Sequence, residues 1–307
     1  MSLFENLNDS QKLAVEFEGK HALVLAGAGT GKTKTIISRA AYLISQGINP
    51  HKIQIYHPDR VNNQRVMDLA YKIAKNLNGS TFHAWCINII KSNPKVFSFH
   101  DFSVIDKEDQ VNIFKLISGK DKEILEETRV SPATLSDIYS YVMNTHKSLT
   151  ETIRKFLYNN KNDDETDRAI QKNKPYIERA IREYIKYKRD HKYLDYDDLL
   201  SSVVSALRRN DSARKHIASQ YDHILVDEMQ DTNPLQWDLL NLFKDDCHLF
   251  CVGDDAQSIY AFRGADFKNV HSFKTRVPDS EVLKLEDNYR STQEILDISN
   301  WLLSQSA

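Results

Sequence analysis

The chain has 307 residues, of which 41% are hydrophobic and 27% are charged, and its formal net charge is −2. This length allows two domains with a sizeable core, and the near-neutral charge excludes a chain that binds nucleic acid through bulk positive charge. No apolar run approaches the ~20 residues that cross a bilayer, and the N-terminal residues lack the pattern of a secretory signal. The three cysteines form no CxxC motif, which favours free thiols in a reducing cytosol and predicts a cytoplasmic protein.

Short apolar runs alternate with amphipathic stretches over the first hundred residues, a pattern typical of βαβ units on a parallel sheet. Strands are predicted at 21–26, 52–56 and 80–82, and helices at 32–44 and 61–77. From about residue 103 to residue 192 the strand signals nearly vanish, and polar segments with helical spacing replace them. In this stretch Ser131-Pro132 marks a helix start, and residues 164–192 fit one long helix.

The α/β pattern returns after residue 192. Strands are predicted at 223–226, 248–252 and 281–285, and helices at 234–243 and 292–303. The sequence therefore predicts an α/β domain with a parallel sheet, into which an all-helical domain is inserted.

A glycine-rich loop stands between the first predicted strand and the first predicted helix. In such a P-loop the backbone N–H groups turn toward a phosphate at the N-terminus of the following helix. Lys32 is expected to reach the β- and γ-phosphates, and the Thr33 hydroxyl to coordinate Mg²⁺. Ala26 replaces the first glycine of the general pattern. The predicted nucleotide-binding residues of the loop are Gly27, Ala28, Gly29, Thr30, Gly31, Lys32, Thr33 and Lys34.

An acidic pair follows the strand predicted at 223–226. Asp227 is the expected partner of Mg²⁺, and Glu228 is placed to polarise an attacking water as a general base. Taken alone, such a pair is also compatible with two solvated carboxylates at a strand end. Together with the P-loop it predicts a nucleoside triphosphatase site.

Several segments then occur in the order found in one protein family. Residues 226–232 read VDEMQDT, 252–265 read VGDDAQSIYAFRGA and 285–291 read LEDNYRS, while TFHAW at 81–85, LDYDDLL at 194–200 and Leu7-Asn8 with Gln11 and Ala14 are further matches. These segments resemble the motifs of UvrD/Rep/PcrA-like superfamily 1 DNA helicases across nearly the whole chain. The resemblance implies a RecA-like fold, ATP as the nucleotide and an ATP-dependent DNA helicase as the activity.

The resemblance also implies roles around ATP. The Gln11 amide, which both donates and accepts hydrogen bonds, is expected to read adenine, and Tyr289 to stack on it. Gln257 and Arg290 are expected near the γ-phosphate, where they sense its loss and stabilise transferred charge.

Single-stranded DNA and single/double-strand junctions are the partners that the resemblance implies, with 3′-to-5′ movement. Tyr260 and Phe262 would stack on unpaired bases, each contact contributing ~1–3 kcal/mol. Ordinary core aromatics are the alternative interpretation of these two residues. Phe82 and His83 are further candidates for DNA contact, although His83 is equally well interpreted as a structural histidine.

Two departures from the family pattern limit this interpretation. The segment after the second strand normally reads TFTNKAA and contacts DNA, whereas residues 57–63 here read HPDRVNN, with proline in place of the aromatic residue and an added acidic residue. The chain also stops shortly after the LEDNYRS segment, although family motors need a second RecA-like domain to close on ATP. We therefore expect missing C-terminal domains and no unwinding by this chain alone.

The expected organisation is a RecA-like ATPase domain in two parts, an inserted helical domain and the start of a truncated second RecA-like domain. The ranges are 1–102 and 193–280 for the first domain, 103–192 for the insertion and 281–307 for the second domain. Two alternative functions stay open at this point. One is the motor part of a RecB- or AddA-like helicase–nuclease, and the other is a nucleotide-dependent binding module without motor activity.

Overall fold

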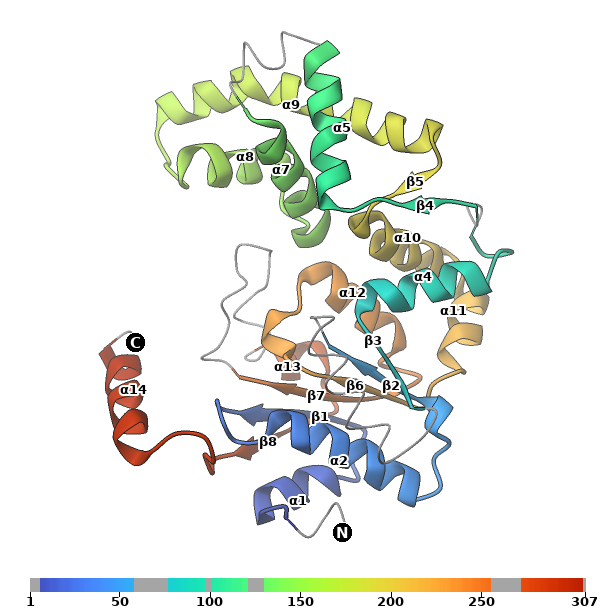
Figure 1. The fold of residues 1–307 in the computed structure, drawn as a ribbon, viewed down its shortest axis with the longest axis vertical. Coiled ribbons are helices and arrows are strands. Elements are labelled where there is room, and N and C mark those ends of the chain that lie inside the picture. Colours follow the sequence, from blue (N-terminus) through green and yellow to red (C-terminus); the bar gives the residue numbers. More distant parts are fainter. Residues whose placement is uncertain (1–5, 58–76, 98–100, 121–129, 255–271, 306–307) are drawn as a thin grey trace.

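A computed structural model describes residues 6–57, 77–97, 101–120, 130–254 and 272–305 (Figure 1). Nearly all of the helix predicted at 61–77 lies outside the described residues, as do Gln257, Tyr260 and Phe262.

Within the described residues, six strands form one parallel sheet in the order β3-β2-β6-β7-β1-β8. They are β1 (His21–Ala26), β2 (Ile53–Tyr56), β3 (Asn78–Ser80), β6 (His223–Val226), β7 (His248–Gly253) and β8 (Ser280–Leu285). The inner strands β1, β2 and β6 are mostly apolar and are buried along nearly their whole length, because helices cover both faces of the sheet.

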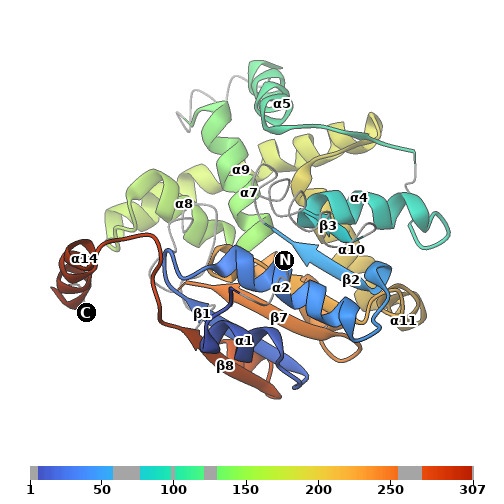
Figure 2. The same ribbon diagram turned by 60° about the horizontal axis from the view of Figure 1, so that its bottom comes forward.

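Two helical layers enclose this sheet (Figures 1 and 2). One layer packs on the face that carries Val24 and Ile55, and the other packs on the face that carries Leu23 and Tyr56, as the alternation of side chains along a strand requires. The first layer consists of α1 (Asp9–Val15) and α2 (Lys32–Ser45), and the second of α4 (Phe82–Ser92), α10 (Tyr196–Arg209), α11 (Asp211–Ala218) and α12 (Pro234–Phe243).

Helices from the middle of the chain form a separate body beside the sheet, seen at the top of Figure 1. They have their own hydrophobic core, in which the rings of Phe114 and Tyr184 stack with centroids 4.4 Å apart. Ser131 caps α7 by accepting a hydrogen bond from the Thr134 N–H, and Pro132 occupies the first turn, as the sequence predicts. The helices are α5 (Lys107–Lys120), α7 (Pro132–Thr145), α8 (Leu149–Tyr158) and α9 (Asp164–Asp190).

The two bodies are joined by a short ladder and a polar bridge. Strands β4 (Ser103–Val104) and β5 (Tyr193–Leu194) pair in parallel where the chain leaves and re-enters the α/β part. Nearby, the Asn144 amide of α7 donates to Asp197 Oδ1 at 2.5 Å, and the Asn233 amide donates to Asn144 Oδ1 at 3.0 Å. Asn233 caps α12, so the helical body is bonded to the start of a helix that covers the sheet.

The structure corrects two expectations. Residues 281–285, which the sequence assigns to a second domain, belong to β8, and β8 pairs with β1 at the edge of the first sheet. The strand predicted at 80–82 ends at Ser80, because Thr81 accepts a hydrogen bond from the Ala84 N–H at 3.2 Å and starts α4. The short elements η1 (Pro50–Lys52), η2 (Met229–Asp231) and α13 (Phe273–Arg276) complete the α/β part.

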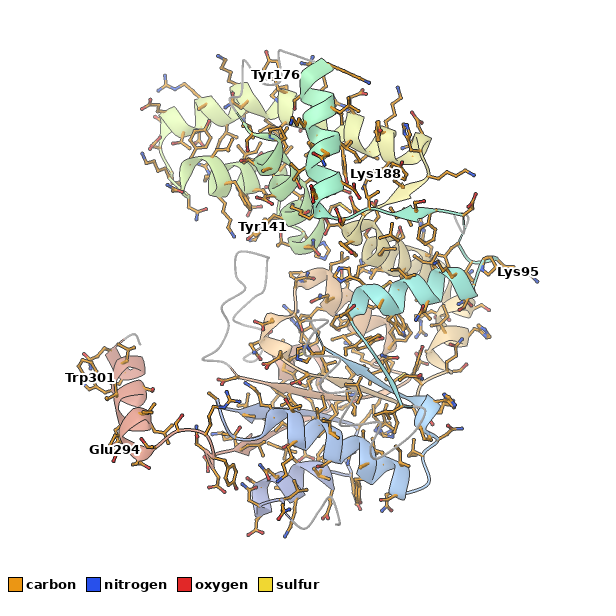
Figure 3. All side chains as sticks on the ribbon, in the orientation of Figure 1. Lys95, Tyr141, Tyr176, Lys188, Glu294 and Trp301 are labelled. Atoms are coloured by element: carbon orange, nitrogen blue, oxygen red, sulfur yellow. The ribbon has the colours of Figure 1, made fainter. Side chains whose placement is uncertain are left out.

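The last helix, α14 (Gln293–Gln305), stands apart from the sheet near the C-terminus (Figure 1). It leaves large apolar side chains in solvent, and Ile298, Trp301 and Leu302 are each more than 60% exposed (Figure 3). None of the helices in the described part of the chain combines the length and the hydropathy that a membrane span needs.

Candidate nucleotide and metal site

The glycine-rich loop connects β1 to α2 and has the backbone of a phosphate cradle. Gly29 and Gly31 have φ of 79° and 90°, a region that glycine enters without steric cost, and Gly31 directly precedes the first residue of α2. The Thr30 hydroxyl donates to the Gly27 carbonyl at 2.8 Å and closes the turn. The loop therefore presents the N-terminus of a long helix to solvent, as an anion site requires.

Two segments distant in sequence hold this loop. Gln11 is buried, and its amide donates to the Thr30 carbonyl at 2.9 Å while its oxygen accepts from the Asn8 N–H at 3.2 Å. The amide has a second N–H and its oxygen has a second lone pair, so a contact between Gln11 and adenine need not replace either bond. The predicted adenine reader lies against the P-loop, as its role requires.

The segment after β8 approaches the loop from the other side. The Tyr289 N–H donates to the Gly29 carbonyl at 2.9 Å, and the Asn288 amide donates to the Ala28 carbonyl. Tyr289 is 64% exposed, and its hydroxyl accepts from the Asn8 amide at 2.8 Å. The exposed Arg290 lies so close to the loop that a Cβ added to Gly29 would stand 2.6 Å from its Cβ. The structure thus brings Gln11, Tyr289 and Arg290 to one loop.

Lys32 lies between two carboxylates that follow neighbouring strands. Its Nζ is 3.6 Å from Glu228 Oε2 and 3.6 Å from Asp254 Oδ2. The parallel strands β1, β6 and β7 end at the same edge of the sheet, so the residues that follow them meet there. Lys34 points elsewhere, because its Nζ donates to the Asn6 carbonyl.

Gln230, to which the sequence analysis assigns no role, connects these carboxylates. Its amide donates to Glu228 Oε2 at 2.7 Å, and its oxygen accepts from the Asp254 N–H at 2.9 Å. Gly253 makes this contact possible, since a Cβ there would lie 2.9 Å from Gln230 Oε1. Glu228 itself has φ of 49°, a conformation that is uncommon outside glycine and concentrates at functional sites.

The site carries more negative charge than Lys32 offsets. Burial, and then the charge of Glu228, raise the pKa of Asp227 to about 7, and the same two causes raise the pKa of Asp231 to about 7. Asp227 Oδ1 accepts from the Glu228 N–H at 2.9 Å, while Oδ2 is buried and accepts no hydrogen bond from the described residues. A buried, unsatisfied carboxylate oxygen near a P-loop fits a hard divalent cation. The residues present therefore fit Mg²⁺, with Asp227 and the half-buried Thr33 as candidate ligands.

The predicted DNA contacts have a mixed outcome. Phe82 is 2% exposed and stacks on Tyr56 with ring centroids 4.5 Å apart, so it is a core residue and cannot stack on a base. Its neighbour His83 is half-buried, and its ring lies edge-on to the exposed Tyr196 ring at 5.4 Å. Burial lowers the pKa of His83 to about 4, so this imidazole is neutral near pH 7 and offers no charge to a phosphate. Tyr196, which the sequence analysis does not single out, is the more accessible aromatic at this position.

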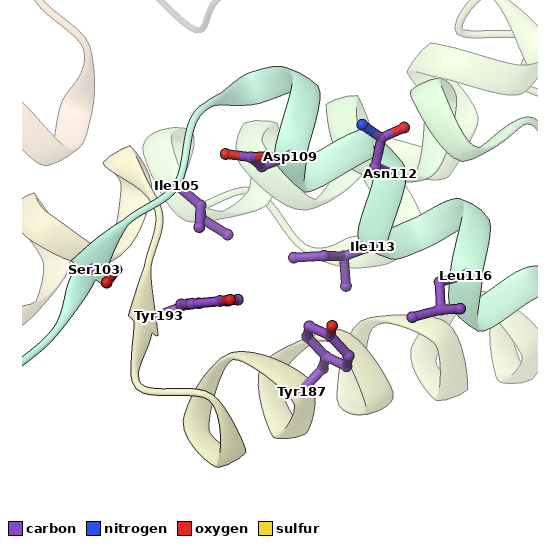
Figure 4. A pocket seen from close by; sticks show the side chains of 8 residues that line it. All are labelled: Ser103, Ile105, Asp109, Asn112, Ile113, Leu116, Tyr187 and Tyr193. Carbon is purple, nitrogen blue, oxygen red and sulfur yellow. The ribbon is translucent and has the colours of Figure 1, made fainter.

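A hollow of about 460 Å³ lies in the helical body, between α5, α9 and the β4–β5 ladder (Figure 4). Its lining includes Ile105, Ile113, Tyr187 and Tyr193, and it contains none of the residues predicted for nucleotide, metal or DNA. Nearby, Lys188 of α9 is buried and bonded to two aspartates of the LDYDDLL segment (Figure 3). That segment therefore has a structural role in joining α9 to α10.

Comparisons with known proteins agree with these observations. A family model described as the UvrD/REP helicase N-terminal domain matches residues 7–278. The chain is 32% identical over 320 residues to the ATP-dependent DNA helicase UvrD1 of Mycobacterium tuberculosis, covering 99% of this chain and 40% of that protein. It is 29% identical over 313 residues to the ATP-dependent DNA helicase PcrA of Staphylococcus epidermidis, covering 100% and 41%. For the ATP-dependent DNA helicase Rep of Buchnera aphidicola, the identity is 33% over 316 residues, covering 98% and 45%. The chain thus spans 40% to 45% of the length of these curated relatives.

Proposed function

Because the chain belongs to the UvrD/REP helicase N-terminal domain family, we propose that it is the ATP-binding part of a DNA helicase motor that moves 3′-to-5′ on single-stranded DNA. The observation that carries this proposal is the position of Lys32, at the N-terminus of α2 and between Glu228 and Asp254. Cysteines stay reduced in the cytoplasm, so the three buried free thiols, Cys86, Cys247 and Cys251, support a cytoplasmic location in this proposal.

Each residue of the site has a distinct task in this proposal. Lys32 and the loop N–H groups bind the ATP phosphates, and Thr33 with Asp227 holds Mg²⁺, which neutralises phosphate charge when it is bound. Glu228 polarises the attacking water, and its carboxylate is held for this task by the Gln230 amide at 2.7 Å. Gln257, which lies outside the described residues, and Arg290 respond to the γ-phosphate.

DNA binding is the second part of the proposal. Tyr260 and Phe262 lie outside the described residues, and we retain them as base-stacking candidates. The His83–Tyr196 ring pair at the N-termini of α4 and α10 is a further aromatic surface. Single-stranded DNA and its junctions with duplex are the expected partners, and the C-terminal part of a longer motor would cover the apolar face of α14.

Two variants test the nucleotide site. Lys32→Ala removes the cation between the two carboxylates and is expected to weaken ATP affinity at least ~10-fold, because charge-assisted hydrogen bonds contribute about 1.5–3 kcal/mol. Glu228→Gln is expected to retain Mg²⁺–ATP binding and to slow single-turnover hydrolysis ~100-fold or more. Calorimetry and hydrolysis assays measure the two effects, with the exposed Lys12→Ala as control. Unchanged ATP affinity in Lys32→Ala would contradict the proposed site.

Anisotropy of labelled single-stranded DNA at low salt, with and without a non-hydrolysable ATP analogue, tests the DNA part. Binding that responds to nucleotide supports the motor. Nucleotide binding without any DNA response would favour the binding module, for which the altered residues 57–63 are the specific observation. A nuclease domain in the longer gene product would instead identify a RecB- or AddA-like helicase–nuclease.

A further inference from the structure

His57 stands beside the carboxylate that we assign to the cation. Strands β2 and β6 are parallel neighbours with Tyr56 opposite Val226, so the residues that follow them are adjacent. The Asp227 N–H donates to the Tyr56 carbonyl at 2.9 Å, and the His57 N–H donates to the Ser80 carbonyl at 3.3 Å. These backbone bonds fix both residues, and His57 Nε2 lies 3.8 Å from Asp227 Oδ2.

Both side chains are enclosed. His57 is 4% exposed and Asp227 is 1% exposed. Asp227 Oδ2, the oxygen that faces His57, is the one that accepts no hydrogen bond from the described residues. Burying an unsatisfied carboxylate oxygen is unfavourable unless a cation or a donor compensates it. The imidazole nitrogen and this oxygen therefore face the same enclosed position.

The separation suits two ligands of one ion. Ligand atoms that each lie about 2.1 Å from a cation are about 3.0 Å apart at a right angle and about 4.2 Å apart on opposite sides. The separation of 3.8 Å between His57 Nε2 and Asp227 Oδ2 falls within this range. Glu228, Asp231 and Asp254 add further negative charge at the same edge of the sheet, with Lys32 as their cationic neighbour.

The imidazole is also a departure from the family pattern. In the TFTNKAA segment that residues 57–63 replace, the first position is threonine, whereas this chain has histidine. Mg²⁺ prefers oxygen ligands, whereas a site that includes an imidazole nitrogen binds the first-row transition ions with an affinity that rises from Mn²⁺ through Co²⁺ to the later ions. A histidine at this position changes the chemistry of the metal site.

We propose that His57, through Nε2, is a further protein ligand of the divalent cation held by Asp227 and Thr33, and that it shifts the preference of the site from Mg²⁺ toward Mn²⁺ and Co²⁺. The proposal rests on the proposed function, because the cation in question is the one that accompanies ATP.

Pulsed electron paramagnetic resonance on the 307-residue chain, loaded with Mn²⁺ and a non-hydrolysable ATP analogue, tests this ligand directly. A ¹⁴N modulation is expected, and it should change to the ¹⁵N pattern when only the histidines of the protein are labelled with ¹⁵N. Labelling excludes adenine nitrogen as the source and needs no substitution, so it does not depend on a variant that folds. A spectrum that is indifferent to histidine labelling would overturn the proposal.

A competition experiment assigns the nitrogen and measures the preference. In His57→Thr the ¹⁵N-histidine signal should be lost, and the ratio of Mn²⁺ to Mg²⁺ affinity of the nucleotide complex should fall ~10-fold or more. The exposed His51→Asn serves as the matched control and should keep both. An unchanged ratio in His57→Thr overturns the proposal.

The same measurements distinguish a failure of the proposed function from a failure of the His57 ligand alone. If the wild-type chain shows no nucleotide-dependent binding of Mn²⁺, or if Lys32→Ala binds as well as wild type, the nucleotide site is wrong and the His57 ligand is rejected with it. Binding that Lys32→Ala abolishes but that shows no histidine signal retains the nucleotide site and rejects the ligand alone.

Discussion

Gly31 and Gly47 have the same backbone conformation but different surroundings. At Gly47 only the conformation favours glycine, whereas at Gly31 a close neighbour also excludes a side chain. Their φ angles are 90° and 91°, so alanine at either position costs about 1 kcal/mol of backbone strain. A Cβ on Gly31 would also stand 2.8 Å from Gln11 Nε2, whereas a Cβ on Gly47 meets nothing within 4 Å. The Gln11 amide could yield only by breaking its bond to the Thr30 carbonyl.

We therefore predict that Gly47→Ala lowers the free energy of unfolding by about 1 kcal/mol and leaves nucleotide affinity unchanged. Gly31→Ala should lower the free energy of unfolding further and weaken nucleotide binding, because the P-loop loses its contact with Gln11. Urea denaturation and calorimetry measure the two quantities. Equal behaviour of the two variants would mean that the Gln11 contact does not support the loop.

For individual residues, the sequence predicts those site members that lie within one continuous segment. Lys32 and Thr33 can be proposed from the sequence because a P-loop is one continuous segment between a strand and a helix. Gln230 and His57 are not predicted as site residues, because their partners follow other strands. No single segment of the sequence shows that β2, β6 and β7 are neighbours in the sheet. Phe82 fails for a related reason, since burial against Tyr56 is a property of the packed sheet.

The junction of α9 and α10 depends on one buried cation. Lys188 Nζ donates to Asp195 Oδ2 at 2.6 Å, to Asp198 Oδ2 at 2.5 Å and to the Tyr139 hydroxyl at 2.9 Å. Asp195 also caps α10, so the same carboxylate starts the helix that returns the chain to the sheet. Removing the cation leaves two enclosed aspartates that keep hydrogen-bond donors, such as the Tyr184 hydroxyl at 2.8 Å from Asp195 Oδ2, but lose the charge of Lys188.

We predict that Lys188→Ala lowers the free energy of unfolding by about 3–5 kcal/mol, the usual cost of breaking a buried ion pair from one side. Lys186→Ala on the exposed side of α9 is the matched control and should change stability by less than about 0.5 kcal/mol. Chemical denaturation monitored by circular dichroism gives both values. A loss below 1 kcal/mol in Lys188→Ala would show that the network is not needed for folding.

Most helices and strands can be predicted from the local sequence pattern, whereas the pairing of the strands cannot. The predicted ranges 21–26 and 234–243 coincide with β1 and α12, because apolar runs and caps bound them clearly. The place of β8 in the sheet cannot be predicted from the sequence, because its partner β1 lies more than 250 residues earlier and only the two end residues of β8 are buried. A domain boundary read from the family pattern alone therefore falls one strand too early.

At the scale of the molecule, the described part of the chain consists of two bodies with separate cores, which several polar contacts connect. The bridge from Asp197 through Asn144 reaches Asn233, two residues after η2, which follows the carboxylate pair of the nucleotide site. Burial, and then the charge of Asp195, raise the pKa of Asp197 to about 6. The insertion is thus hydrogen-bonded to the start of α12, two residues after the segment that carries Glu228 and Gln230.

Two buried histidines, His21 and His223, lie at the end of the sheet opposite the nucleotide site. Burial is the main cause that lowers the pKa of both His21 and His223 to about 4, from an ordinary value of 6.5. The His21 ring accepts a hydrogen bond at Nδ1 from the Leu249 N–H at 3.0 Å, which requires the neutral imidazole. The charged or titratable groups that act on the two rings are Lys20, His248, Asp245 and Asp279 for His21, and His248, Arg39 and Asp222 for His223.

A folded-state pKa below the unfolded value means that the unfolded chain binds more protons between the two. Each imidazole therefore stabilises the fold fully above pH 6.5, and this contribution is lost as the pH falls from 6.5 toward 4. The size is at most of the order of 3 kcal/mol for each ring.

We predict a steep fall of the melting temperature as the pH falls from 6.5 toward 4. His21→Asn and His223→Asn should each remove about one proton from the pH dependence of unfolding, and the exposed His51→Asn is the control variant. If all three variants keep the wild-type slope, the acid limit is set elsewhere, and the buried carboxylates at the nucleotide edge cannot supply it, because their raised pKa values make the folded chain bind more protons than the unfolded chain.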